Sequence, residues 1–305
     1  VCSSDLRLGI LSVFFLVVAY LTQYFVNKPD FGAFLSSDMD SVGNVYVLGV
    51  NQNKSQYKVT KIRSGGSMAF KVDLENSNDE AAYSYRNIEA DSKGNFYLVK
   101  EKRNLKAVAS DKSLYPISSE SVLMYDTNGN YIKEVVNLDF SKYANPPVNG
   151  YIQKIQILNQ KMTVVGCQDD RYDVITANPL TDESPKKIKT FTVTPPVNIA
   201  DRSIKWVGDV SVLSTGRVFY STKNGQLWGM NNQGEFTDYS NAISTSKFLI
   251  TEMSVDSNDD IYFNDSISGS FYKLDTKSIT SKVVYNLDTP LDRKSTRLNS
   301  SHMNL

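Results

Sequence analysis

The sequence predicts an all-β protein in which one apolar helix precedes a series of four-stranded units. Three observations carry this prediction. A hairpin with the turn pattern D-x-x-G-N recurs along the chain, a second hairpin follows each copy, and an uncharged apolar run precedes them all. Two hairpins per period give four antiparallel strands, and periods of roughly 43 to 66 residues are near those of β-propeller blades. We therefore expect a β-propeller with five four-stranded blades visible in the sequence.

Both ends of the chain resemble translated sequencing adapter. Residues 292–302 can be encoded by DNA that looks like a standard short-read library adapter, and residues 1–6 by the reverse complement of its start. A fragment read from adapter-ligated DNA explains both ends, whereas a natural basic polar tail is the alternative. Because foreign ends do not belong to the fold, we expect residues 1–6 and 292–305 to carry no function.

Excluding these ends changes the inventory of reactive side chains. The only histidine, His302, and one of the two cysteines, Cys2, are removed. A Ser-His-Asp or Cys-His arrangement then has no histidine, and Cys167 alone cannot form an internal disulfide. The ends hold three basic and two acidic residues, so the counts fall from 33 and 33 to 30 and 31. A net charge near −1 argues against a nucleic-acid partner.

The first predicted element is a transmembrane helix within residues 7–28. Leu8 to Val26 carry no charge and lie between Arg7 and Lys28. At 1.5 Å per residue this run of about 19 residues reaches roughly 28 Å, close to the thickness of a bilayer core. A cleaved signal peptide is the alternative, but its apolar region is usually shorter and ends at an A-x-A-like site. We expect a single-pass signal anchor with the bulk of the chain on the extracytoplasmic side.

A linker at residues 29–37 is expected to lead into the propeller, residues 38–291. The clearest first hairpin reads I-E-A-D-S-K-G-N-F-Y-L from Ile88 to Leu98. Its alternating apolar residues mark two half-buried strands, and the Gly and Asn of its turn tolerate positive φ. The blades are expected to start near residues 38, 86, 152, 204 and 250.

Most of the conspicuous side chains in these repeats are predicted to be structural. The strings that begin at Asp126 and Asp256 look like calcium loops for five positions, but both lack the required Gly and the bidentate Glu. We therefore predict turns there and no metal site. Five aromatic residues alternate with apolar neighbours and are expected to pack between blades: Tyr46, Phe96, Tyr97, Phe219 and Tyr262.

The hairpins resemble those of NHL-type and related six- or seven-bladed β-propellers, a group that includes gluconolactonase-like proteins. The resemblance spans residues 38–287 and rests on the D-x-x-G-N-apolar-Tyr-apolar motif. The third unit lacks both Asp and Gly, and the fourth has Leu213 where Asp is expected. The resemblance implies a ring that closes with six to eight blades, so we expect one or more blades beyond the five.

The resemblance also implies binding on the face where the loops between second and third strands and between blades gather. Residues near the starts of innermost strands and the ends of second strands are the candidates for that face. They are Arg86, Lys100, Lys154, Asp169, Lys205, Lys223, Glu252 and Asn264. Three basic residues among the four at the inner rim would suit an anionic ligand. Ordinary solvated rim charges are the alternative.

Three classes of function are consistent with this sequence. The first is a membrane-anchored extracytoplasmic module that binds or senses a ligand, such as an anionic small molecule, a glycan or an envelope protein. The second is an interaction scaffold for envelope proteins. The third is a metal-dependent lactonase or hydrolase, for which Glu252, Asp169 and Asn264 would supply oxygen ligands. Because no compact catalytic cluster is visible, the sequence favours binding over catalysis, and no cofactor is expected.

Overall fold

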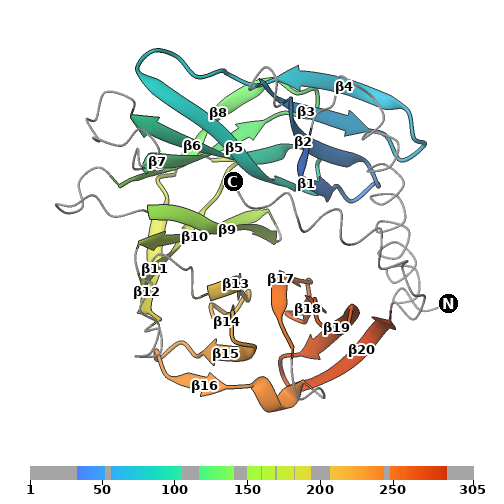
Figure 1. Ribbon diagram of the computed structural model, residues 1–305, viewed down its shortest axis with the longest axis vertical. Helices are drawn as coiled ribbons and strands as arrows, with labels where there is room; N and C mark the ends of the chain where they lie inside the picture. The colour runs from blue at the N-terminus through green and yellow to red at the C-terminus, as the bar shows by residue number, and fades with distance from the viewer. Residues whose placement is uncertain are drawn as a thin grey trace. The chain divides into compact units, whose positions relative to one another are not determined.

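A computed structural model describes the chain in nine stretches. They are residues 33–51, 56–104, 117–140, 150–158, 160–168, 170–181, 183–193, 207–243 and 248–286. Within them the chain forms five four-stranded sheets, and neighbouring strands in each sheet are consecutive in the sequence (Figure 1). This up-and-down order is that of a propeller blade. The predicted all-β organisation in five four-stranded units is therefore confirmed.

The strands have the following bounds. Blade 1 comprises β1 (Ala33–Met39), β2 (Val45–Asn51), β3 (Gln56–Ile62) and β4 (Met68–Asp73). Blade 2 comprises β5 (Ala81–Ala90), β6 (Phe96–Asn104), β7 (Ile117–Tyr125) and β8 (Tyr131–Asp139). Blade 3 comprises β9 (Gly150–Leu158), β10 (Lys161–Gln168), β11 (Arg171–Ala177) and β12 (Lys186–Thr192). Blade 4 comprises β13 (Val207–Val212), β14 (Val218–Thr222), β15 (Gln226–Met230) and β16 (Phe236–Asp238), followed by a 3-10 turn, η2 (Ser240–Ala242). Blade 5 comprises β17 (Ile250–Val255), β18 (Ile261–Asp265), β19 (Ser270–Asp275) and β20 (Thr280–Asn286).

The chain divides into two compact units. Unit 1 holds residues 1–160 and 177–185, and unit 2 holds residues 161–176 and 186–305. The first strand of a blade can begin before its sequence motif. β1 begins at Ala33, inside the stretch predicted to be linker, and β5 begins at Ala81, before the predicted start near residue 86. The motif marks only the second half of these innermost strands, which accounts for the difference.

The D-x-x-G-N turn is closed by its aspartate, as blade 2 shows in detail. The Asp91 Oδ1 atom accepts the backbone N–H groups of Lys93 (2.8 Å) and Asn95 (3.0 Å). Its Oδ2 atom accepts the side-chain amide of Asn95 (2.8 Å) and the hydroxyl of Tyr97 (3.0 Å). Gly94 has a φ of +86°, which a residue with a Cβ adopts only with strain. The repeated aspartate is therefore held by hydrogen bonds within its own hairpin.

The same turn recurs in other blades. Asp40, Asp126 and Asp256 each accept the backbone N–H groups two and four residues later, at 2.8–3.1 Å. In blade 4 the side-chain oxygen of Asn231 accepts the corresponding pair. The two strings that resemble calcium loops are thus turns, as predicted, and their first carboxylates bind their own backbone.

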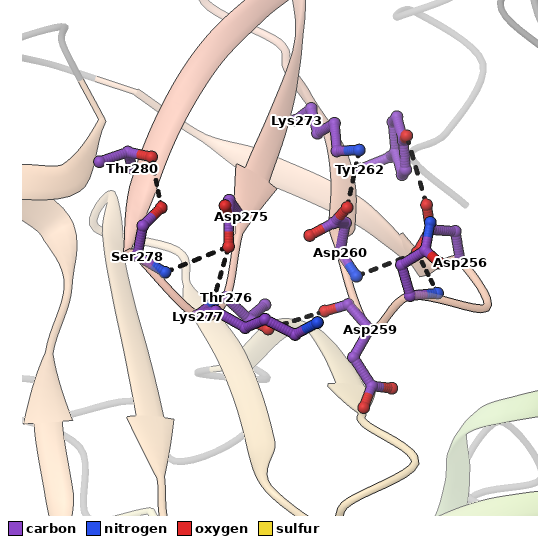
Figure 2. A network of polar contacts seen from close by, with 11 residues as sticks. Asp256, Asp259, Asp260, Tyr262, Lys273, Asp275, Thr276, Lys277, Ser278 and Thr280 are labelled. Carbon is purple, nitrogen blue, oxygen red and sulfur yellow. Dashed lines mark hydrogen bonds and ion pairs between the residues drawn. The ribbon is translucent and has the colours of Figure 1, made fainter. Parts of the chain in front are cut away.

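Figure 2 shows the blade 5 copy of this turn and the ion pair beside it. The Lys273 Nζ atom lies 2.7 Å from the Asp260 carboxylate and 5.4 Å from the ring centroid of Tyr262. The hydrogen bond to Asp260 raises the pKa of Lys273 above its ordinary value. In blade 1, Lys61 lies opposite Tyr46 in the strand register, with its Nζ atom 4.9 Å from the ring centroid. A lysine–tyrosine pair between second and third strands is therefore a repeated feature.

Apolar side chains of neighbouring blades pack together within each unit. In unit 1 the buried rings of Tyr46 and Phe96 belong to one cluster, with their centroids 5.4 Å apart. In unit 2 the buried rings of Phe219 and Phe263 belong to another cluster. Full burial of such a side chain contributes about 1.5–3 kcal/mol. The predicted packing of the motif aromatics is confirmed for Tyr46, Phe96 and Phe219. Tyr97 is fully buried, whereas Tyr262 is only partly buried.

Carboxylates tie one blade to the backbone of the next at three places within the units. Each accepts a backbone N–H group from the first strand of the following blade. The pairs are Asp38 with Ala90 (2.7 Å), Glu120 with Ile152, and Asp209 with Met253 (2.7 Å). Hydrogen bonds to ionised acceptors are the stronger ones, so these contacts reinforce the packing of apolar side chains.

Basic side chains make a second set of contacts between successive blades. Each donates from its ammonium or guanidinium group to a backbone carbonyl oxygen in a turn of the next blade. The pairs are Lys61 with Thr127 (3.2 Å), Lys133 with Thr181 (2.6 Å), Lys189 with Gly216 and Asn231 (both 3.0 Å), and Arg217 with Thr276 (3.1 Å). We call these five contacts, which come from four basic side chains, the turn latches.

The predicted membrane anchor, Leu8–Val26, lies outside the described residues, as do both adapter-like ends. Among the residues that the structure does describe, none forms a helix with the length and apolar character needed to cross a bilayer.

Candidate functional site

Unit 1 contains an open cavity of about 540 Å³ on one face of blade 2. Strands β6 and β7 are nine residues long, and residues two apart on a strand share a face. Alternate residues of these strands, neighbours on β5 and β8, and one residue that precedes β5 form the lining. They are Glu75, Tyr83, Tyr85, Lys100, Lys102, Ser119, Ser121, Leu123, Tyr125, Tyr131, Glu134 and Asn137. We call this feature the blade 2 cavity.

Tyrosines make the aromatic wall of the blade 2 cavity. Tyr85 and Tyr125 are buried, whereas Tyr131 is 56% exposed. The rings of Tyr125 and Tyr131 meet edge to face with centroids 5.7 Å apart, and Tyr125 also stacks on Phe96 at 4.9 Å. Burial, and then the nearby charges of Tyr131 and Glu75, raises the pKa of Tyr125 to about 12. The hydroxyl of Tyr125 therefore stays protonated at neutral pH, and Tyr131 is the ring that is most open to a ligand.

The charges that line the blade 2 cavity balance, and part of them is paired. Lys100 forms an ion pair with Glu75, and its Nζ atom lies 3.9 Å from the ring centroid of Tyr83. The Asn137 side-chain amide donates to Glu134 at 2.9 Å. With Lys102, the lining holds two ammonium groups and two carboxylates. The cavity therefore offers rings, hydroxyls and an amide to a ligand without an excess of either charge.

A second polar cluster lies on the opposite face of blade 2. Glu120 is fully buried, and both of its carboxylate oxygens accept from the Arg86 guanidinium, at 2.5 and 2.6 Å. The Ile152 N–H group donates to the same carboxylate. Burial raises the pKa of Glu120, and the interactions with Arg86 and Ile152 oppose that rise. Because all of these contacts lie within unit 1, the cluster supports the packing of the first strand of blade 3 on blade 2.

The structure brings one of the predicted site residues to the cavity. Lys100 lines it, and Arg86 does not. In the β5–β6 register Lys100 lies opposite Tyr85, whereas Arg86 lies opposite Val99. Because adjacent residues of a strand point to opposite faces, the two cations are not brought together. The guanidinium of Arg86 is instead held by the buried carboxylate described above.

The remaining candidates are placed as follows. Lys154 is partly buried on β9 and has a polar or electrostatic partner. In unit 2, Glu252 and Lys223 are exposed, and the Asn264 side-chain oxygen accepts from the Thr251 hydroxyl at 3.1 Å. Asp169 and Lys205 lie outside the described residues. Within the described stretches of the chain, no group of three or more His, Cys, Asp or Glu side chains is placed to hold a metal ion.

The tyrosines of the cavity and Glu75 were not predicted from the sequence. The available signal was Tyr83-Ser84-Tyr85, which alternates with period two directly before the repeat motif. That alternation extends the first strand of blade 2 toward its N-terminus and puts both rings on one face. Glu75 carries no such signal, because it lies between β4 and β5 and reaches the cavity only in the folded chain.

The described residues form five four-stranded meanders, and successive blades share recurrent contacts within each unit, which is the organisation of a β-propeller. No protein-family model matches the sequence. No curated protein is similar enough to match it either.

Solved β-propeller structures resemble the chain at low sequence identity. A protein from Lactobacillus plantarum is 11% identical, with a TM-score of 0.48 over 82% of this chain and 70% of that one. The periplasmic gluconolactonase of Pseudomonas aeruginosa is 12% identical, with a TM-score of 0.48 and the same two coverages. YCF48 from Cyanidioschyzon merolae is 13% identical, with a TM-score of 0.42 over 85% and 87%.

Proposed function

We propose that the chain is a membrane-anchored, extracytoplasmic binding module and that the blade 2 cavity is its ligand site. The cavity is the observation that carries the proposal. Its volume of about 540 Å³ lies within the range of small-molecule sites. Its lining combines an exposed ring, Tyr131, with polar groups on three strands, a composition that suits recognition more than internal packing.

The pairing of charges in the structure bears on the class of ligand that we propose. The predicted anionic ligand depended on basic residues at the rim of the propeller. Arg86 is paired with the buried Glu120, and Lys100 is paired with Glu75. Because both of these cations are already paired, we do not propose that the blade 2 cavity takes an anionic ligand. An envelope protein or a glycan remains within the proposal.

Binding is tested by comparing variants of two adjacent residues of β8. Tyr131 lines the cavity, whereas Ile132 is 49% exposed and does not. A library of small molecules is screened against the full chain by ligand-observed NMR, and each hit is measured again with Tyr131→Ala and Ile132→Ala. We expect hits that Tyr131→Ala weakens about tenfold and that Ile132→Ala leaves unchanged. A screen whose hits respond equally to both substitutions would remove the cavity from the proposal.

Anchoring and orientation are tested separately. The proposal derives from the uncharged run Leu8–Val26, which is long enough to span a bilayer. In cells that express the full chain, we expect the protein to stay in the membrane fraction after alkaline carbonate washing. Protease added outside the cytoplasmic membrane is expected to digest the blades. Release by carbonate, or protection from that protease, would contradict the anchored extracytoplasmic arrangement.

A further inference from the structure

We infer that the blade 2 cavity binds a neutral sugar, as one or two rings of a larger glycan. This inference depends on the proposed function and specifies its ligand class. It is derived from the charge balance of the lining, from the exposure of one ring, and from the kind of polar groups that share the cavity with that ring.

The charge balance disfavours ionic ligands of both signs. An anion would approach the carboxylates of Glu75 and Glu134, and a cation would approach Lys100 and Lys102. Moving an ion out of water is costly unless a partner of opposite charge compensates. Lys100 is already engaged with Glu75 and with the ring of Tyr83. A neutral polar ligand avoids this desolvation cost.

The exposed ring suits the apolar face of a sugar. Tyr131 is 56% exposed, and its edge-to-face contact with the buried Tyr125 holds its ring in position. The face of an aromatic ring carries partial negative charge, and the axial C–H groups of a pyranose carry partial positive charge. Stacking of a sugar on Tyr131 would therefore cover apolar area on both partners.

Hydroxyl and amide groups line the same cavity further along β7 and β8. Ser121 lies opposite Asn137 in the β7–β8 register, and Ser119 is two residues away on the same face. Hydroxyl and amide groups donate and accept hydrogen bonds, which matches the hydroxyl groups of a sugar. Glu134 adds acceptor oxygens, and the cavity has room for about two pyranose rings by the usual size of such sites.

The test titrates the full chain with three neutral disaccharides: maltose, cellobiose and N,N′-diacetylchitobiose. Trilysine and digalacturonic acid serve as cationic and anionic probes, and binding is measured by NMR or calorimetry. We expect at least one neutral disaccharide to bind saturably. Its affinity is expected to change less than about twofold between low and high salt, because no charge on the ligand is screened.

Substitutions of single lining residues show whether a disaccharide binds in the blade 2 cavity. We expect Tyr131→Ala to weaken disaccharide binding about tenfold or more, and Tyr131→Phe, which keeps the ring, to retain most of it. Ile132→Ala is the matched control and should bind as the parent chain does. If Tyr131→Ala fails to fold, a loss of binding by Ser121→Val together with retention by Ile132→Ala gives the same answer.

Three results would overturn the inference. The first is that none of the disaccharides shows saturable binding. The second is that substitution of Tyr131 and of Ser121 leaves the affinity unchanged. The third is that a charged probe binds in a way that depends on Tyr131 and the sugars do not. In the third case the proposed binding function stands and only the sugar is wrong. If no small molecule of any class depends on Tyr131, the proposed ligand site fails as well.

Discussion

Replacement of Asp91 by alanine tests the role assigned to the repeated aspartate. Asp91 accepts four hydrogen bonds, one of them from Tyr97, whose side chain is fully buried. Asp126 in the second hairpin of the same blade accepts the two equivalent backbone N–H groups and the Asn130 amide, but no tyrosine. The two turns therefore differ chiefly in the buried hydroxyl, and Asp126→Ala is the matched control.

The expected magnitudes follow from this difference. In Asp126→Ala the freed groups are exposed and bond to water, so the free energy of unfolding should fall by about 1 kcal/mol. In Asp91→Ala the hydroxyl of Tyr97 also loses an acceptor, and a buried unsatisfied hydroxyl costs a further 1–3 kcal/mol, roughly. The double variant Asp91→Ala/Tyr97→Phe has no hydroxyl to leave unsatisfied. It should recover about 1–2 kcal/mol relative to the sum of the two single variants.

The assay is urea unfolding followed by circular dichroism, with all four variants and the parent chain measured in one buffer. We expect Asp91→Ala to unfold at a clearly lower urea concentration than Asp126→Ala. Equal midpoints for these two, together with additive effects in the Asp91–Tyr97 cycle, would refute the assigned role of the buried hydroxyl.

Two further outcomes are expected. Burial raises the pKa of Glu120 in the fold above its ordinary value of 4.5, so folding favours the protonated form. The free energy of unfolding of the parent chain should therefore fall relative to that of Glu120→Gln as the pH rises from about 4 through the pKa of Glu120 in the fold. Chemical denaturation of both proteins at several pH values measures this. A difference in unfolding free energy that stays constant across that range would contradict the prediction. Gly225 and Gly234 both have positive φ, but an added Cβ at Gly225 would overlap the carbonyl oxygen of Phe248, whereas none is close at Gly234. Gly234→Ala should lower the free energy of unfolding by about 1 kcal/mol and Gly225→Ala by clearly more, as thermal unfolding will show; equal losses would mean that the close approach to Phe248 is absent.

The repeat could be predicted because its cause is local. The hydrogen bonds that close the turn at Asp91 all come from residues within six positions of it. A short stretch of sequence therefore contains every residue that forms the turn. The starts of the blades were harder to place. The first halves of β1 and β5 carry no turn motif, and they are strands because β2 and β6 continue beyond the motif and pair with them.

The cavity could not be predicted because its parts are distant in the sequence. Glu75 meets Lys100, 25 positions later, only after β5 and β6 have paired. The sequence predicted Lys100 at the end of a second strand, whereas β6 continues to Asn104. It could not show that a carboxylate and the ring of Tyr83 already engage that ammonium group.

The turn latches bear on how such a protein can change over evolutionary time. Each latch ends on a main-chain carbonyl oxygen, which every amino acid possesses. The receiving turn can therefore exchange its side chains freely, provided that its backbone keeps the same path. Only the donating lysine or arginine is constrained, and each blade can lose recognisable similarity to the others while the joint between them persists. The contacts between blades can therefore persist through substitutions that leave little sequence similarity among the blades.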